Sequence, residues 1–154
     1  MITIDVSDFA KAIKNIEERE QWLRERTEEL VQRLTDYGVL LASVAFEGAA
    51  YDGVNDVKVT FEEQGELTRA IVATGEAVLF IEFGAGVTYG FGHPEPLGYG
   101  PGTYPGKGHW NDPNGWYYDH GKKSYGNPPA EAMYNARKQI EEDIETIAQE
   151  VFSH

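Results

Sequence analysis

The residues of this chain that could do chemistry gather in one stretch, from Phe80 to Pro129. Histidines and aspartates in this stretch are of the types that bind zinc and related metal ions. They are His93, His109, His120, Asp112 and Asp119. Their spacing matches no known ligand pattern, and histidines scattered through a polar loop more often lie at the surface or form hydrogen bonds. We therefore predict no metal site.

The same stretch also has the composition of a carbohydrate site, where aromatic faces stack on sugar rings and two carboxylates act as acid and base. The candidate residues are Glu82, Glu95, Asp112 and Asp119, with Trp110, Trp116, Tyr117 and Tyr118. A carbohydrate-binding or carbohydrate-active protein is therefore one interpretation. In the simpler interpretation, which we prefer, the rings attach the loop to its own domain or to a neighbour, and Glu82 accepts hydrogen bonds from loop amides.

Other catalytic and cofactor motifs are weakly represented. Gly84-Ala85-Gly86 lacks the third glycine and the strand–helix–strand context of a dinucleotide site, and no Gly-Lys-Ser/Thr phosphate loop occurs. Neither a serine nor a cysteine triad has local support. We predict no catalytic residue, no cofactor and no enzyme activity.

The N-terminal element that must position this stretch is a helical region spanning residues 7–48. Its apolar residues recur in steps of three, four and seven, which is typical of one face of a helix. They are Ile13, Ile16, Leu23, Leu30, Leu34, Tyr37, Leu41 and Val44. We expect this stripe to be buried. An unbroken helix from Asp8 to Glu47 would be about 60 Å long, wider than a small domain, so we also expect a kink near residues 17–21.

The middle of the chain predicts an antiparallel meander over residues 54–83. Val57, Val59 and Phe61 alternate with polar residues, and turns at Gln64-Gly65 and at 74–76 separate this strand from two more, at 67–73 and 77–83. In the last strand, Glu82 would point away from Ile81 and Phe83. We expect the apolar face of the meander to pack on the long helix.

A long loop, residues 84–127, separates the meander from a C-terminal helix over residues 128–152. All 7 prolines lie between Pro94 and Pro129, and Pro128 and Pro129 suit the first turn of that helix. We expect at least the part of the loop from Tyr104 to Tyr125 to pack on the sheet or on an adjacent subunit, because its rings would otherwise lie in water. The predicted fold is α+β, in a single domain covering residues 1–154.

Bulk composition limits the partners. The chain has 154 residues, no cysteine and a formal net charge of −13, which argues against sequence-specific or phosphate-directed binding of nucleic acid. No apolar run is long enough to cross a bilayer, and the N-terminus does not resemble a signal peptide. We therefore expect that the protein is made in the cytoplasm and does not associate with a membrane.

Several segments resemble the tail-completion, or neck, proteins of long-tailed bacteriophages. The resemblance runs from about Val57 to the C-terminus. It is carried by the phrase at residues 80–86 (FIEFGAG), the segments at 102–106 and 112–116, and the PPAEAMYNA run at 128–136. A Glu-Phe-Gly phrase is common alone, but its pairing with a proline-initiated helix is more specific.

The resemblance implies an α+β fold and a structural, non-enzymatic protein of the virion, at the head–tail interface of a phage or prophage. It implies a homo-oligomeric ring of six copies between the portal-adaptor complex and the tail tube or tail-terminator protein. The candidate contacts with neighbouring copies or partners are Glu82, Phe83, Tyr104, Trp110, Trp116, Tyr117, Tyr118 and Tyr125.

Overall fold

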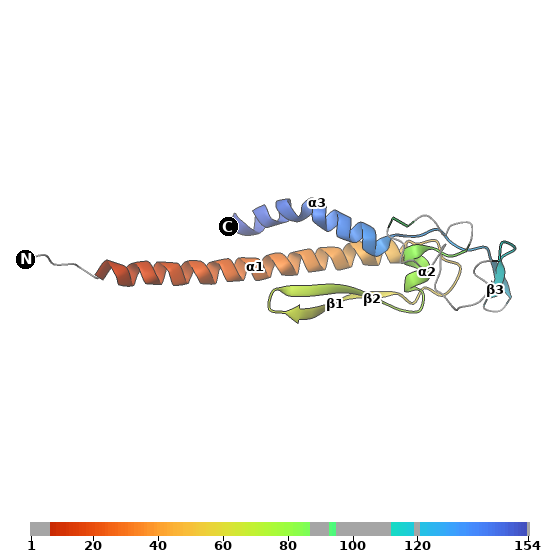
Figure 1. Ribbon diagram of the computed structural model, residues 1–154, viewed down its shortest axis with the longest axis horizontal. Helices are drawn as coiled ribbons and strands as arrows, with labels where there is room; N and C mark the ends of the chain where they lie inside the picture. Colours follow the sequence, from red (N-terminus) through yellow and green to blue (C-terminus); the bar gives the residue numbers. More distant parts are fainter. Residues whose placement is uncertain (1–6, 87–92, 95–111, 119–120, 154) are drawn as a thin grey trace, which may run out of the picture.

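A computed structural model of the chain describes residues 7–86, 93–94, 112–118 and 121–153. Seven elements lie in this part of the chain (Figure 1). In chain order they are α1 (Ser7–Glu47), β1 (Lys58–Gly65), β2 (Thr68–Thr74), α2 (Val78–Phe83), β3 (Trp116–Tyr118), β4 (Lys122–Ser124) and α3 (Ala132–Phe152). Two long helices with antiparallel two-stranded sheets confirm the predicted α+β class.

Helix α1 is the axis of the molecule. The β1–β2 hairpin and α3 lie along different sides of it, and α2 lies near its C-terminal end (Figure 1). Gly38 marks the place where the three elements meet, because a Cβ atom there would overlap the side chains of Ile71 in β2 and Ile140 in α3. The absence of a side chain at Gly38 therefore allows both neighbours to approach the helix backbone.

A polar contact also ties α1 to α3. The Tyr37 hydroxyl donates to Asp143 Oδ2 at 2.8 Å, and Gln139 Nε2 donates to the same oxygen at 2.8 Å. The hydrogen bonds from Gln139 and then Tyr37 lower the pKa of Asp143. The pKa of Tyr37 is raised in turn, because its hydroxyl proton is held by the hydrogen bond to Asp143.

The first two predicted strands are confirmed. β1 and β2 pair antiparallel, with Val59 opposite Ala73 and Phe61 opposite Ile71, so these four side chains share one face of the hairpin. Ile71 reaches Gly38 of α1 from this face. The predicted packing of the hairpin on the long helix is therefore also confirmed.

The predicted third strand is wrong. Residues Val78–Phe83 form the helix α2, so among the described residues the sheet of β1 and β2 has two strands and is not a meander. The sequence of α2 is rich in β-branched and aromatic residues, which favour strands, but its surroundings favour a helix. The Asp56 carboxylate accepts hydrogen bonds from the Glu76 and Ala77 amides just before the helix, and both Ile81 and Glu82 are buried, which a strand with one face in solvent would not allow.

The predicted kink in the long helix is also wrong, since α1 is one helix of 41 residues. Residues 17–21 contain no proline or glycine, and the Lys14–Glu18 ion pair (3.6 Å) links turns on either side of residue 17. The helix can be longer than a small domain is wide because its N-terminal part projects beyond the other elements (Figure 1). The predicted burial of the stripe fails in this part, where Ile13, Ile16 and Leu23 are more than half exposed, and also at Val44 near the other end of the helix.

Two boundaries near the loop differ from the prediction. Helix α3 begins at Ala132, four residues later than expected, so Pro128 and Pro129 precede the helix and do not form its first turn. The residue before the helix, Glu131, has a left-handed backbone (φ 53°). Within the predicted loop, β3 and β4 form a short antiparallel hairpin.

A cluster of buried apolar side chains lies where the C-terminal end of α1 meets α2 and the start of α3. It contains Phe46, Ala77, Ile81 and Ala132, each nearly or completely buried. This cluster fixes the place of α2, and therefore of Glu82, relative to both long helices. Among the helices of the described residues, none is long and apolar enough to cross a membrane.

Candidate functional site

Two segments that are about fifty residues apart in the sequence meet in one junction, which we call the α2–α3 junction (residues 80–85 and 127–134). The Ala85 amide donates to the Asn127 carbonyl at 2.9 Å, and the Asn127 amide donates to the Ala85 carbonyl at 3.0 Å. The Ala130 amide donates to the Ile81 carbonyl at 2.8 Å, so a carbonyl at the C-terminal end of α2 finds its partner in the chain that leads into α3.

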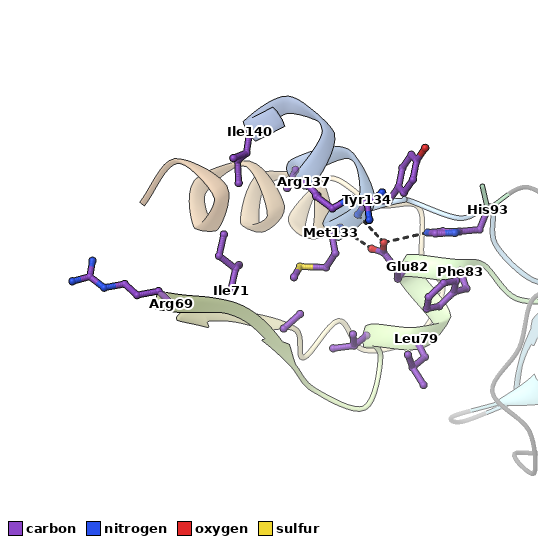
Figure 2. A pocket seen from close by; sticks show the side chains of 13 residues that line it. Arg69, Ile71, Leu79, Glu82, Phe83, His93, Met133, Tyr134, Arg137 and Ile140 are labelled. Atoms are coloured by element: carbon purple, nitrogen blue, oxygen red, sulfur yellow. Dashed lines mark hydrogen bonds and ion pairs between the residues drawn. The ribbon is translucent and has the colours of Figure 1, made fainter. Parts of the chain in front are cut away.

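Glu82 lies at the centre of this junction. One carboxylate oxygen accepts the Met133 amide at 2.9 Å and the other accepts the Tyr134 amide at 3.0 Å (Figure 2). These amides belong to the first turn of α3, and amides in the first turn of a helix have no acceptor within their own helix. No side-chain cap is provided by Glu131, the residue just before the helix. Glu82 therefore caps α3 from another helix, and its negative charge also faces the positive end of the α3 dipole.

His93 completes the surroundings of the carboxylate. Its Nε2 lies 3.3 Å from Glu82 Oε1, and both side chains are only 6% exposed. The imidazole ring lies between two aromatic rings, with centroids 4.4 Å from Phe83 and 5.6 Å from Tyr134 (Figure 2). The Arg137 guanidinium lies 5.4 Å from the centre of the Tyr134 ring. Glu82 is thus held by two backbone amides and by its contact with the His93 ring, which suits a structural role more than proton transfer.

Asp56 sets the position of α2 from its other end. Its two carboxylate oxygens accept the Glu76 amide at 2.8 Å and the Ala77 amide at 2.9 Å. These two hydrogen bonds lower the pKa of Asp56. Because the charged carboxylate is the form that accepts both bonds, the turn before α2 is most stable when Asp56 is ionised.

An open groove of about 680 Å³ lies beside the junction, between the hairpin, α2 and α3 (Figure 2). Its lining is mainly apolar and includes Ile71, Leu79, Met133 and Ile140. Glu82 and His93 lie at one end of the groove and Arg69 at the other (Figure 2). The groove could receive an apolar side chain of another protein, but the carboxylate in it is already engaged by the chain itself.

A second group of candidate residues lies on and next to the β3–β4 hairpin, at the opposite end of the molecule from the start of α1 (Figure 1). Tyr117 is 71% exposed and Tyr125 is 58% exposed. The Lys123 ammonium lies 5.8 Å from the centre of the Tyr117 ring and 5.0 Å from that of Tyr125. The two rings therefore flank one cation on the surface.

This hairpin is fastened to the rest of the molecule at its base. The Ser124 hydroxyl donates to Asp52 Oδ2 at 3.1 Å and accepts the Gly126 amide at 3.1 Å. A Cβ atom at Gly126 would overlap the Ala85 carbonyl, and its φ of 103° is one that other residues rarely adopt. Gly126 is therefore required for the close approach of this segment to the α2–α3 junction.

The structure divides the predicted contact residues. Glu82 and Phe83 belong to α2, Trp116, Tyr117 and Tyr118 to β3, and Tyr125 follows β4. Tyr117 and Tyr125 do not pack on the molecule as we expected, so their burial against a neighbouring subunit stays a prediction. The remaining candidates lie outside the described residues. They are Tyr104, Trp110, Glu95, His109, Asp119 and His120.

The candidates for a metal or sugar site that lie among the described residues form hydrogen bonds or contacts within the chain. Asp112 Oδ1 accepts the Asn114 amide at 2.8 Å, which is typical of a turn. His93 contacts Glu82, and no group of three or more potential metal ligands occurs in the part of the chain that the structure describes.

Sequence reasoning found Glu82 and its structural role but assigned the wrong donors. Among the described residues, the donors to Glu82 are the Met133 and Tyr134 amides of α3, and its other contact is the His93 ring. Asp56 and Asn127 were missed altogether. Asp56 lies just before the first strand, where no sequence motif indicates its role. Asn127 lies directly before two prolines, which is a typical position for a residue that organises a turn.

Comparison with protein-family models found no match for the chain. The searches of curated proteins and of solved structures found no match either.

Proposed function

We propose that this chain is a non-enzymatic structural protein of a tailed bacteriophage or prophage. In this proposal it is a head–tail connector, or tail-completion protein, that forms a ring between the portal-adaptor complex and the tail tube. The proposal rests first on the segments that resemble neck proteins.

The observation that carries the proposal is that the two most specific of these segments form one structural unit. The FIEFGAG phrase supplies Glu82, and the PPAEAMYNA run supplies the Met133 and Tyr134 amides that Glu82 caps. The carboxylate that the two segments share is buried and holds two helices together. A motif pair used in this way serves to fix a shape, as a building block of an assembly requires.

The surface also supports an assembling protein. Several large apolar side chains are more than half exposed, which is typical of surfaces that contact other proteins. Those outside the N-terminal part of α1 include Leu40, Val44, Val54, Tyr117 and Tyr125. Together with the exposed apolar residues of the N-terminal part of α1, they are distributed over both ends of the molecule, as expected for a subunit with more than one neighbour.

The alternative function, binding of a carbohydrate, is favoured by one observation. The exposed rings of Tyr117 and Tyr125 lie beside Lys123, and exposed rings can stack on sugars. Saccharide binding that Tyr117→Ala with Tyr125→Ala abolishes would support this alternative. Such binding would not by itself indicate hydrolysis, because the two candidate carboxylates that the structure describes, Glu82 and Asp112, are engaged in hydrogen bonds within the chain.

The experiment that tests the proposed function is deletion and complementation in the phage or prophage that contains the gene. Without the gene, we expect DNA-filled heads and free tails that electron microscopy shows as separate particles. Complementation with the parent gene should restore joined, infectious particles, and Glu82→Gln should restore more than Glu82→Leu. Normal joined particles in the deletion strain would contradict the proposal.

A further inference from the structure

The N-terminal part of α1, residues 8–21, projects beyond every other described element and is called the arm below (Figure 1). Its limits are set by two contacts. The ring of Phe152, the last residue of α3, lies 5.8 Å from that of Trp22, and Glu66 at the tip of the hairpin pairs with Arg24. Every residue of the arm is exposed, over a length of about 21 Å.

The arm carries an apolar stripe that the described chain leaves uncovered. Phe9, Ile13 and Ile16 in the arm, and Leu23 just after it, are each more than half exposed. Their spacings of four, three and seven residues match the repeat of 3.5 residues with which helices pair in coiled coils. An isolated helix of this length is marginally stable in water, so a partner that buries the stripe would stabilise the arm.

The packing of α3 along the rest of α1 indicates what kind of partner the arm binds. There α3 packs along the helix, through contacts such as Tyr37 with Asp143 and Arg33 with Glu150 (3.6 Å). At the end of α3 this helix–helix interface stops, whereas the stripe on α1 continues for about four more turns. The element that extends such an interface is another helix.

The charges of the arm favour a second copy of the same arm. The chain as a whole carries −13, but the arm is close to neutral, with three basic and four acidic residues. They are Lys11, Lys14 and Arg19 against Asp8, Glu17, Glu18 and Glu20. Both lysines lie in the first half of the arm and all three glutamates in the second half, so two arms attract each other when they run in opposite directions.

We propose that the arm pairs antiparallel with the arm of a second copy of this chain, through Phe9, Ile13 and Ile16 and through Leu23 just beyond the arm, with the two Ile16 residues near the centre. Parallel pairing would bring Glu20 beside its copy at the apolar seam. The paired length is short, so the association is in the micromolar range. The inference does not depend on the proposed function, because a two-fold contact differs from the head-to-tail contact of a ring.

The first test compares two variants of the full chain by sedimentation velocity. Ile16→Asp places a charge in the seam, and the control Asn15→Asp adds the same charge one residue away, outside the seam. We expect the parent to dimerise, Ile16→Asp to weaken dimerisation by about 100-fold, and Asn15→Asp to change it by less than about fivefold. A parent that stays monomeric at about 100 µM, or an Ile16→Asp variant that associates like the parent, would overturn the proposal.

The second test determines direction, and the absence of cysteine from the chain makes it simple. Phe9→Cys and Leu23→Cys are prepared separately, mixed, and treated with a short bifunctional maleimide. In an antiparallel pair, Phe9 of one copy lies near Leu23 of the other, whereas two copies of Phe9 are about 21 Å apart. We expect crosslinks mainly between the two different variants. Equally efficient crosslinking of Phe9→Cys to itself would overturn antiparallel pairing.

Discussion

The α2–α3 junction and the arm use similar residues for opposite purposes. Ile81 in the junction is 0% exposed, whereas Ile16 in the arm is 65% exposed. Glu82 in the junction has three partners in its own chain, whereas Glu20 in the arm is a surface residue beside an uncovered apolar stripe. The junction is therefore complete within one chain, and the arm is not. The sequence of the junction specifies the fold, and the sequence of the arm specifies association.

The largest effect is expected at Glu82. Glu82→Leu leaves the Met133 and Tyr134 amides without their acceptor in a buried place and removes the contact with the His93 ring, so it should lower the free energy of unfolding by about 4 kcal/mol. Glu82→Gln keeps the shape and one acceptor oxygen, so its loss should be about half as large. Urea unfolding of the monomer measures both. Unchanged stability in Glu82→Leu would show that the capping of α3 contributes little to the fold.

The next largest effect on the free energy of unfolding comes from a comparison of the same substitution at two isoleucines. Ile81→Ala removes a fully buried side chain and should cost about 3 kcal/mol of unfolding free energy, whereas Ile16→Ala should change it by less than about 0.5 kcal/mol. Both values are obtained from urea unfolding at a concentration low enough to keep the chain monomeric. If Ile16→Ala were as destabilising as Ile81→Ala, the arm would have to be buried within its own chain.

A smaller effect is expected at Gly38, where α1 meets both β2 and α3. Gly38→Leu should destabilise the fold by about 2 kcal/mol, because its side chain would displace Ile71 and Ile140. Gly38→Ala is the matched control, since the gain in helix propensity, about 1 kcal/mol, offsets the closer contact with two flexible side-chain ends. Thermal unfolding followed by circular dichroism measures both. Equal stability of the leucine and alanine variants would mean that the three elements are loosely packed there.

The smallest effect depends on pH. The folded-state pKa of Asp56 is lowered by its hydrogen bonds to the Glu76 and Ala77 amides, so the carboxylate stabilises the fold above the ordinary aspartate pKa of 3.8. This contribution is lost as the pH falls below 3.8 towards the folded-state pKa. Asp56→Asn should therefore lower the melting temperature at neutral pH and reduce its decline in acid. A variant whose decline in acid parallels that of the parent would contradict this role.

Local patterns predicted the long elements well and the junction poorly. The helical repeat of α1 and the alternation in β1 are properties of neighbouring residues, and both elements formed where these patterns occur. Residues 78–83 have the composition of a strand, but Asp56 and α3, which lie far away in the sequence, make a helix more stable there. The kink was predicted from the width of a compact domain, an assumption that fails for a helix with an exposed end.

The candidate site was also predictable only in part, because a sequence shows a residue and its neighbours but not the partners that the fold brings to it. Glu82 stands out in the sequence because a single carboxylate lies between apolar residues, but its donors are brought to it by the fold of α3. His93 could be noticed only as a histidine in a loop, where nothing nearby indicates an interaction with Glu82. The stripe of the arm was visible as a helical pattern, but the pattern does not show whether its partner belongs to the same chain.

Amide hydrogen exchange at two protein concentrations tests the contrast between junction and arm most directly. At about 1 µM and at about 100 µM, the Met133 and Tyr134 amides should exchange equally slowly, because their acceptor lies in the same chain. The amides of residues 12–21 should exchange quickly in the dilute sample and several-fold more slowly in the concentrated one, where a second copy covers the arm. Protection of the arm that does not change with concentration, or junction amides that exchange as quickly as those of the arm, would contradict this account.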